Sequence, residues 1–218
     1  MQKGQHERAA LFEGATAVWE AFYGNAGAAR QRATKALALA RGREVDYAAA
    51  LALALSDDVP RSRTVADDLA RNFPEDTSVQ YMYLPMLRAL FSLNAHDPAG
   101  TIQSLATGSR FDLAVGGIGF TGFFGALYPI YLRGEAYLAA HQPADAAAEF
   151  QRILDHRSIV LVDPMGALAR LQLGRALLAS GNAARAKSVY SDLFVLWKIA
   201  DPDIPVLKQA RAEYAKLQ

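Results

Sequence analysis

The chain has 218 residues, of which 52% are hydrophobic, with a formal net charge of +1 and no cysteine. This composition supports a substantial buried core and argues against global disorder. The balanced charge argues against a nucleic-acid-binding arm or a polybasic membrane patch, so neither partner is expected. Without cysteine the chain has no disulfide, no thiolate metal ligand and no Cys nucleophile. The first residues (MQKGQHERAALFEG) have no apolar core of the kind that a signal peptide needs.

The N-terminal part predicts two helices, over residues 7–23 and 28–40. Apolar residues recur in the first helix at the i, i+3, i+4, i+7 spacing of a helix with one buried face. Gly24 and Asn25, which tolerate the left-handed conformation, are expected to end it. Small residues such as Ala33 on the second helix would let the two helices approach closely. The pattern therefore predicts an antiparallel helical hairpin.

Two further hairpins are expected before residue 107. The first combines helices over 44–55, rich in Ala and Leu, and 61–73, which ends before Pro74. The second combines a helix over 77–93 with one over 99–105, joined by a turn that ends at Pro98.

The segment 107–125 interrupts this regularity. It is longer than the usual connection between packed helices, and long ordered loops are often functional. Residues 113–132 carry no charge and have the length of a membrane span, but five glycines favour a Gly-rich loop that leads into a buried helix. Residues 117–122 match G-x-G-x-x-G, yet the βαβ context of a dinucleotide site is missing.

The clearest repeat signal lies in the C-terminal half, where four positions recur after 40 residues. The recurring residues are Gly134, Tyr137, Ala146 and Phe150, matched by Gly174, Leu177, Ala186 and Tyr190. They predict hairpins over 127–156 and 163–197, followed by a capping helix over 204–217.

These eight residues resemble the tetratricopeptide repeat, which places Gly or Ala and Tyr or Leu in its first helix, and Ala and Phe or Tyr in its second. The resemblance extends over repeats at about 7–41, 44–74, 77–106, 127–156 and 163–197, with an insert at 107–125. It implies an all-α, right-handed superhelical solenoid of about five hairpins, forming a single domain.

A narrower resemblance concerns stretches such as FPEDTSVQYMYLP and LYPIYLRGEAYLAAHQPADAAAEFQRILDHR. They are similar to the C-terminal tetratricopeptide region of bacterial, especially acidobacterial, eukaryotic-like serine/threonine kinases. This resemblance implies a regulatory module of a signalling protein, with any kinase domain upstream. The chain has none of the kinase motifs itself. A membrane span upstream would decide between a cytoplasmic and an extracytoplasmic location.

No catalytic, metal or cofactor motif is found. His6, His96, His141 and His156 form no H-E-x-x-H pair, and neither G-x-S-x-G nor S-x-x-K occurs. We therefore expect no enzymatic activity and no cofactor.

The resemblance implies a concave binding face lined by the first helix of each repeat. The positions expected there are Tyr47, Leu51, Tyr83, Met86, Leu90, Tyr128, Tyr131, Glu135, Leu171 and Arg175. Tyr and Arg are enriched at binding hot spots, so the expected partner is a protein or peptide. The alternative is that these tyrosines pack between repeats or under the Gly-rich segment. The Lys and Asn of the carboxylate clamp found in chaperone-binding members are absent.

Two other functions remain open. One is self-association, in which the chain forms a homodimer. The other is a small-molecule sensor in which the segment 107–125 closes over the groove.

Overall fold

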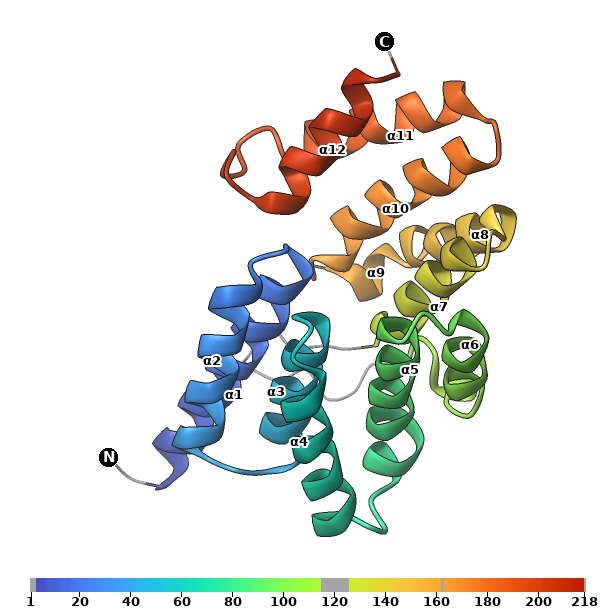
Figure 1. Cartoon of the computed structure of the whole chain (residues 1–218). Helices are drawn as coiled ribbons and strands as arrows, with labels where there is room; N and C mark the ends of the chain where they lie inside the picture. The colour runs from blue at the N-terminus through green and yellow to red at the C-terminus, as the bar shows by residue number, and fades with distance from the viewer. Residues whose placement is uncertain (1–2, 115–125, 162, 218) are drawn as a thin grey trace.

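The structure, a computed structural model, describes residues 3–114, 126–161 and 163–217, and in these ranges it contains helices and no strands (Figure 1). The elements are α1 (Lys3–Phe22), α2 (Ala26–Leu39), α3 (Arg43–Leu55), α4 (Val59–Asn72), η1 (Val79–Tyr83), α5 (Leu84–Asn94), α6 (Pro98–Ala106), η2 (Ser109–Phe111), α7 (Tyr128–Ala139), α8 (Pro143–Asp155), α9 (Arg157–Val160), α10 (Met165–Ala179), α11 (Ala183–Leu196) and α12 (Pro205–Ala215). The predicted all-α class is confirmed. None of the described helices is long and apolar enough to cross a membrane.

Neighbouring helices pack in consecutive pairs: α1 with α2, α3 with α4, α5 with α6, α7 with α8, and α10 with α11. Each pair is closed by the same turn, in which one residue has a positive φ. The following N–H then donates to the carbonyl five residues back, as Asn182 does to Leu177 at 2.8 Å. This is the Schellman motif that ends many helices. Its positive-φ residues are Gly24, Asp57, His96, His141 and Gly181.

Two glycines bring the paired helices close together. A Cβ built on Gly134 would lie 2.6 Å from the ring of Phe150, and one on Gly174 would lie 2.7 Å from the ring of Tyr190. Both rings are fully buried. The glycine on the first helix therefore makes the space that the aromatic ring on the second helix fills, and the same contact recurs after 40 residues.

Two earlier hairpins carry a hydroxyl at the position that Ala146 and Ala186 occupy in the later ones. Ser62 donates to the carbonyl of Ala50 at 2.7 Å, and Thr101 donates to the carbonyl of Ala89 at 3.2 Å. Both hydroxyls are buried, so these bonds satisfy polar groups inside the helix pair.

The helix predicted over 77–93 is a π-helical turn, η1, followed by α5. The N–H of Leu84 bonds the carbonyl of Val79, five residues back. Pro85 follows immediately and has no N–H to contribute to the ladder. The sequence pattern missed this change because the apolar periodicity continues across it.

The segments predicted as connections also contain structure. The linker over 157–164 holds the short helix α9. At the start of the segment 107–125, Asp112 accepts hydrogen bonds from Arg133 at 2.7 Å and Arg152 at 3.0 Å, which anchors it to α7 and α8. Residues 115–125, including the G-x-G-x-x-G match, lie outside the described residues.

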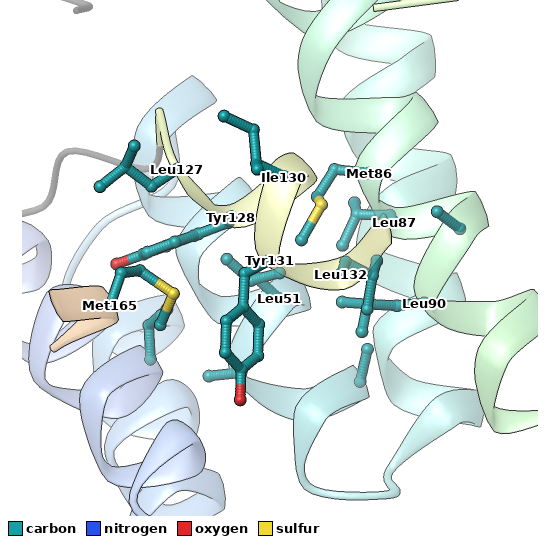
Figure 2. Close-up of a cluster of buried hydrophobic side chains, with 14 of the residues drawn as sticks. Leu51, Met86, Leu87, Leu90, Leu127, Tyr128, Ile130, Tyr131, Leu132 and Met165 are labelled. Carbon is teal, nitrogen blue, oxygen red and sulfur yellow. The ribbon is translucent and has the colours of Figure 1, made fainter. Parts of the chain in front are cut away.

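The main core lies where α3, α5 and α7 meet (Figure 2). Figure 2 shows Met86 and Leu90 of α5 beside Ile130 and Leu132 of α7, with Leu51 of α3 close by. All five side chains are at most 2% exposed.

The last helix reaches the first hairpin. In Figure 1 the N-terminus of α12 lies beside the turn between α1 and α2. The N–H of Val206 donates to the carbonyl of Tyr23 at 3.3 Å. Gly24 (φ +89°) lies against Pro205, where a Cβ would approach the proline Cβ to 3.0 Å. The two ends of the helical series are therefore in contact.

Candidate functional site

A cleft of about 370 Å³ opens where the end of α1 meets the region around α9 and the start of α10. We call it the junction cleft. Its volume falls in the range of small-ligand and peptide-side-chain pockets. The side chains that matter for its chemistry are Tyr23, Arg157, Leu161, Asp163, Arg170 and Trp197.

One wall of the junction cleft is aromatic. Tyr23 follows α1 and Trp197 follows α11, and their rings meet edge to face with centroids 5.9 Å apart. Burial raises the pKa of Tyr23, and the neighbouring Asp163 raises it further. The preceding residue, Phe22, packs edge to face against Tyr128 of α7 at 4.9 Å. The end of α1 is thereby held in place between distant parts of the chain.

Asp163 forms part of the inner surface of the cleft and is only 6% exposed. Its Oδ1 accepts the N–H of Met165 at 2.9 Å, and its Oδ2 accepts the hydroxyl of Tyr128 at 3.3 Å. Burial raises the pKa of Asp163 to about 6, although both hydrogen bonds oppose the rise. Its carboxylate accepts hydrogen bonds from the start of α10 and from α7, and little of the side chain is accessible from the cleft.

Two arginines line the cleft without a carboxylate partner among the described residues. The side chain of Arg157, at the start of α9, is exposed and makes no hydrogen bond or ion pair with a described residue. Arg170, on α10, donates only to the carbonyl of Gly166 in its own helix, at 2.6 Å. A guanidinium has five N–H donors, so most donors of both side chains remain available.

An exposed apolar surface adjoins the cleft at the end of α11. Val195 is 72% exposed, Leu196 is 52% exposed and Ile199 is 90% exposed. Leu196 also lines the cleft, as does the exposed Leu161. We call these four residues the apolar rim. Large apolar side chains exposed beside a cleft are typical of an interaction site.

The residues predicted for the concave face lie mostly inside the chain's own core. Tyr47 is buried and stacks on the partly buried Tyr83 with ring centroids 3.9 Å apart. Met86 and Leu90 belong to the core between α3, α5 and α7, as does Leu51. Leu171 is buried in a separate cluster with Tyr190 and Leu193.

Tyr128 and Tyr131 are buried as well, and the ring of Phe22 contacts both. Figure 2 shows the two tyrosines among the core side chains, with the Tyr128 hydroxyl directed towards Met165. These contacts agree with the alternative that the tyrosines pack between helical pairs. Ligand binding by the predicted face stays a prediction.

Glu135 and Arg175 do come together, through a partly buried polar network. Gln172 donates to Glu135 at 2.9 Å and to the hydroxyl of Tyr131 at 3.1 Å, and Arg175 donates to Gln172 at 3.3 Å. Burial raises the pKa of Glu135 to about 7, against the hydrogen bonds and the charge of Arg175. The network links α7 to α10.

Arg175 continues the network to the last helix. Its Nε and Nη2 donate to the two carboxylate oxygens of Glu213 at 3.0 Å and 2.6 Å, a fork that favours carboxylate recognition. Tyr190 donates to Glu213 at 2.7 Å. Burial acts to raise the pKa of Glu213, but Arg175 and Tyr190 outweigh it, so the pKa is lowered. These groups stabilise α12 and have few donors left for a ligand.

The sequence did not single out Tyr23, Arg157, Arg170 or Trp197. The sequence signal closest to this site is the linker 157–164, which is longer than a minimal helical repeat needs. Contact between residue 23 and residue 197 depends on how the chain curves, which no local pattern records.

Among the described residues, no three His, Asp or Glu side chains gather in a way that could hold a metal ion. Comparison with known proteins found no matching family model, no matching curated protein and no matching solved structure. The resemblance to the tetratricopeptide repeat therefore stays a prediction from the residues that carry it.

Proposed function

We propose that this chain is a non-catalytic protein-interaction module, built as a tetratricopeptide-like right-handed solenoid and acting within a larger signalling protein. The five recurring turns and the two glycine–aromatic pairs support the solenoid. The sequence stretches that resemble kinase-associated repeat regions support the regulatory role.

The observation that carries the proposal is the apolar rim beside the junction cleft. Leu161, Val195, Leu196 and Ile199 are each more than half exposed. Burying large aliphatic side chains of this kind contributes about 1.5–3 kcal/mol each. A partner segment that covered the rim and entered the cleft would gain this energy.

Peptide binding tests the proposal. Peptides selected from a displayed random library would be titrated calorimetrically into the wild-type chain and into a Leu196→Ser/Ile199→Ser variant. We expect binding to the wild type and a loss of about tenfold or more in the variant, since each removed contact is worth about 1–2 kcal/mol. Phe12→Ser is the matched control, because Phe12 is an exposed apolar residue on α1, outside the cleft.

Two results would contradict the proposal. One is the absence of any selected peptide that binds. The other is binding that the double substitution leaves unchanged. Light scattering over a range of concentrations distinguishes peptide binding from self-association. If the wild type is a dimer that the same two substitutions dissociate, the apolar rim is a self-association surface.

A further inference from the structure

Arg157 and Arg170 line the same cleft, and neither has a carboxylate partner among the described residues. By contrast, Arg41 forms an ion pair with Asp46 at 2.7 Å, and Arg175 forms a bidentate ion pair with Glu213. Within the same described ranges, Arg157 has no partner and Arg170 has only a carbonyl of its own helix. Two cations therefore line one cleft, and no described residue forms an ion pair with either of them.

The acid at the cleft does not fill this role. Both oxygens of Asp163 already accept hydrogen bonds, from Met165 and Tyr128, and the side chain is nearly inaccessible to solvent. Because the whole chain has a net charge of only +1, attraction for an anion would be local to the cleft and not a property of the surface as a whole.

Guanidinium groups bind carboxylates through pairs of parallel N–H···O bonds and are more weakly hydrated than ammonium groups. The same cleft offers Tyr23 and Trp197 as an aromatic wall and Leu196 as an apolar edge. A complementary ligand therefore combines a carboxylate with an adjacent apolar side chain.

We propose that the junction cleft selects an acidic–apolar peptide segment, in which Arg157 and Arg170 bind side-chain carboxylates while Trp197 and the apolar rim contact a neighbouring Leu or Phe. This inference rests on the proposed function and specifies its ligand. The site is made where the two ends of the helical series meet, and it uses none of the ten side chains that the sequence predicted for a concave face.

The test uses three matched peptide series of about eight residues. Every peptide contains Leu and Phe at varied positions, and the remaining positions hold Glu in the first series, Gln in the second and Lys in the third. Affinities are measured by fluorescence polarisation for the wild type, for Arg157→Gln/Arg170→Gln, and for the control Arg211→Gln. Arg211 is an exposed arginine of α12 that does not line the cleft.

We expect the Glu series to bind at least about tenfold more tightly than the Gln series, and the double variant to lose this preference. Raising the salt concentration from about 50 mM to about 300 mM should weaken binding of the Glu series in the wild type and leave the double variant unaffected. Arg211→Gln should behave as the wild type. Because Arg157 and Arg170 carry no ion pair among the described residues, the double variant should keep the wild-type melting temperature.

Equal affinity for the Glu and Gln series would overturn the charge selection while leaving the proposed function intact, provided that the apolar-rim substitutions still weaken binding. A preference for Glu that survives in the double variant would place the anion elsewhere and also overturn the inference. If no series binds and the rim substitutions change nothing, the proposed function itself fails.

Discussion

The backbone N–H of Val206 donates to the carbonyl of Tyr23 at 3.3 Å, which joins the last helix to the turn of the first hairpin. These two residues are 183 positions apart in the sequence. The contact brings the end of α1 beside Trp197, and the junction cleft lies next to this contact. Several predictions of this arrangement can be tested independently of any ligand.

Replacing Gly24 should weaken the contact between the chain ends. Gly24→Ala would place a Cβ 3.0 Å from Pro205 in addition to imposing a strained positive φ. Gly181→Ala is a matched control, since Gly181 also has a positive φ but no atom within 4 Å of the added Cβ. We expect Gly24→Ala to cost about 1 kcal/mol more in free energy of unfolding than the control, measured by urea denaturation. Equal losses would show that the contact with Pro205 contributes nothing.

The glycine–aromatic pairs predict a second result. Gly174→Ala would drive a Cβ into the ring of Tyr190, and overpacking of this kind costs about 1–3 kcal/mol, partly offset by the better helix propensity of Ala. We expect a net loss of about 1–2 kcal/mol in the free energy of unfolding. Gly27→Ala on α2, where the added Cβ meets no atom within 4 Å, should be neutral or stabilising. A Gly174→Ala variant as stable as the wild type would contradict the close packing of α10 on α11.

The anchoring of α12 predicts a third result. Glu213→Ala removes the partner of both Arg175 and Tyr190, and leaves a half-buried guanidinium without its carboxylate. We expect the free energy of unfolding to fall by about 1–2 kcal/mol. Amide hydrogen exchange should become faster than in the wild type, and more so in α12 than in α10. Arg211→Ala on the same helix is the control and should change neither quantity. Unaltered exchange of α12 in Glu213→Ala would refute the anchoring role.

The raised pKa of Glu135 predicts a dependence of stability on pH. Its pKa is 4.5 without the fold and about 7 within it, so the folded chain binds more protons between these values. The free energy of unfolding should therefore fall as the pH rises from about 4.5 to about 7, by about 2 kcal/mol from this group. Asp163 contributes in the same direction, between pH 3.8 and about 6.

Glu135→Gln isolates this effect, because the amide oxygen can still accept the hydrogen bond from Gln172. We expect the difference in stability between this variant and the wild type to grow in favour of the variant as the pH rises through the window. A pH-independent difference for Glu135→Gln would disprove a titration at this position.

Local sequence patterns predicted many of the helices and turns of the fold. The apolar periodicity and the turn residues placed the helical pairs to within a few residues, because both are decided by neighbours in sequence. The glycines at 134 and 174 marked helix–helix contacts that the structure shows directly. The π turn at Val79–Tyr83 was not predicted, because a local shift in the backbone hydrogen-bond pattern leaves the hydrophobic periodicity of the sequence unchanged.

The candidate site was much less predictable. Tyr128, Tyr131, Met86 and Leu90 were expected at a concave face from their register, yet neighbouring helices and Phe22 cover them. The repeat register predicts the direction in which a side chain leaves its own helix, but not which other helices pack against that side chain. The cleft lined by Tyr23 and Trp197 depends on how the whole helical series brings its two ends together, which no single hairpin encodes.

The fluorescence of Trp197 tests the central claim most directly. The chain has two tryptophans, Trp19 and Trp197, so Trp19→Phe leaves the one at the cleft as the sole reporter. Titration with an acidic–apolar peptide from the Glu series should shift or quench this emission. The dissociation constant from this titration should equal the one measured by fluorescence polarisation. Arg157→Gln/Arg170→Gln in the same background should abolish the change. A peptide that binds by polarisation without altering Trp197 emission would place the binding site elsewhere and contradict the account.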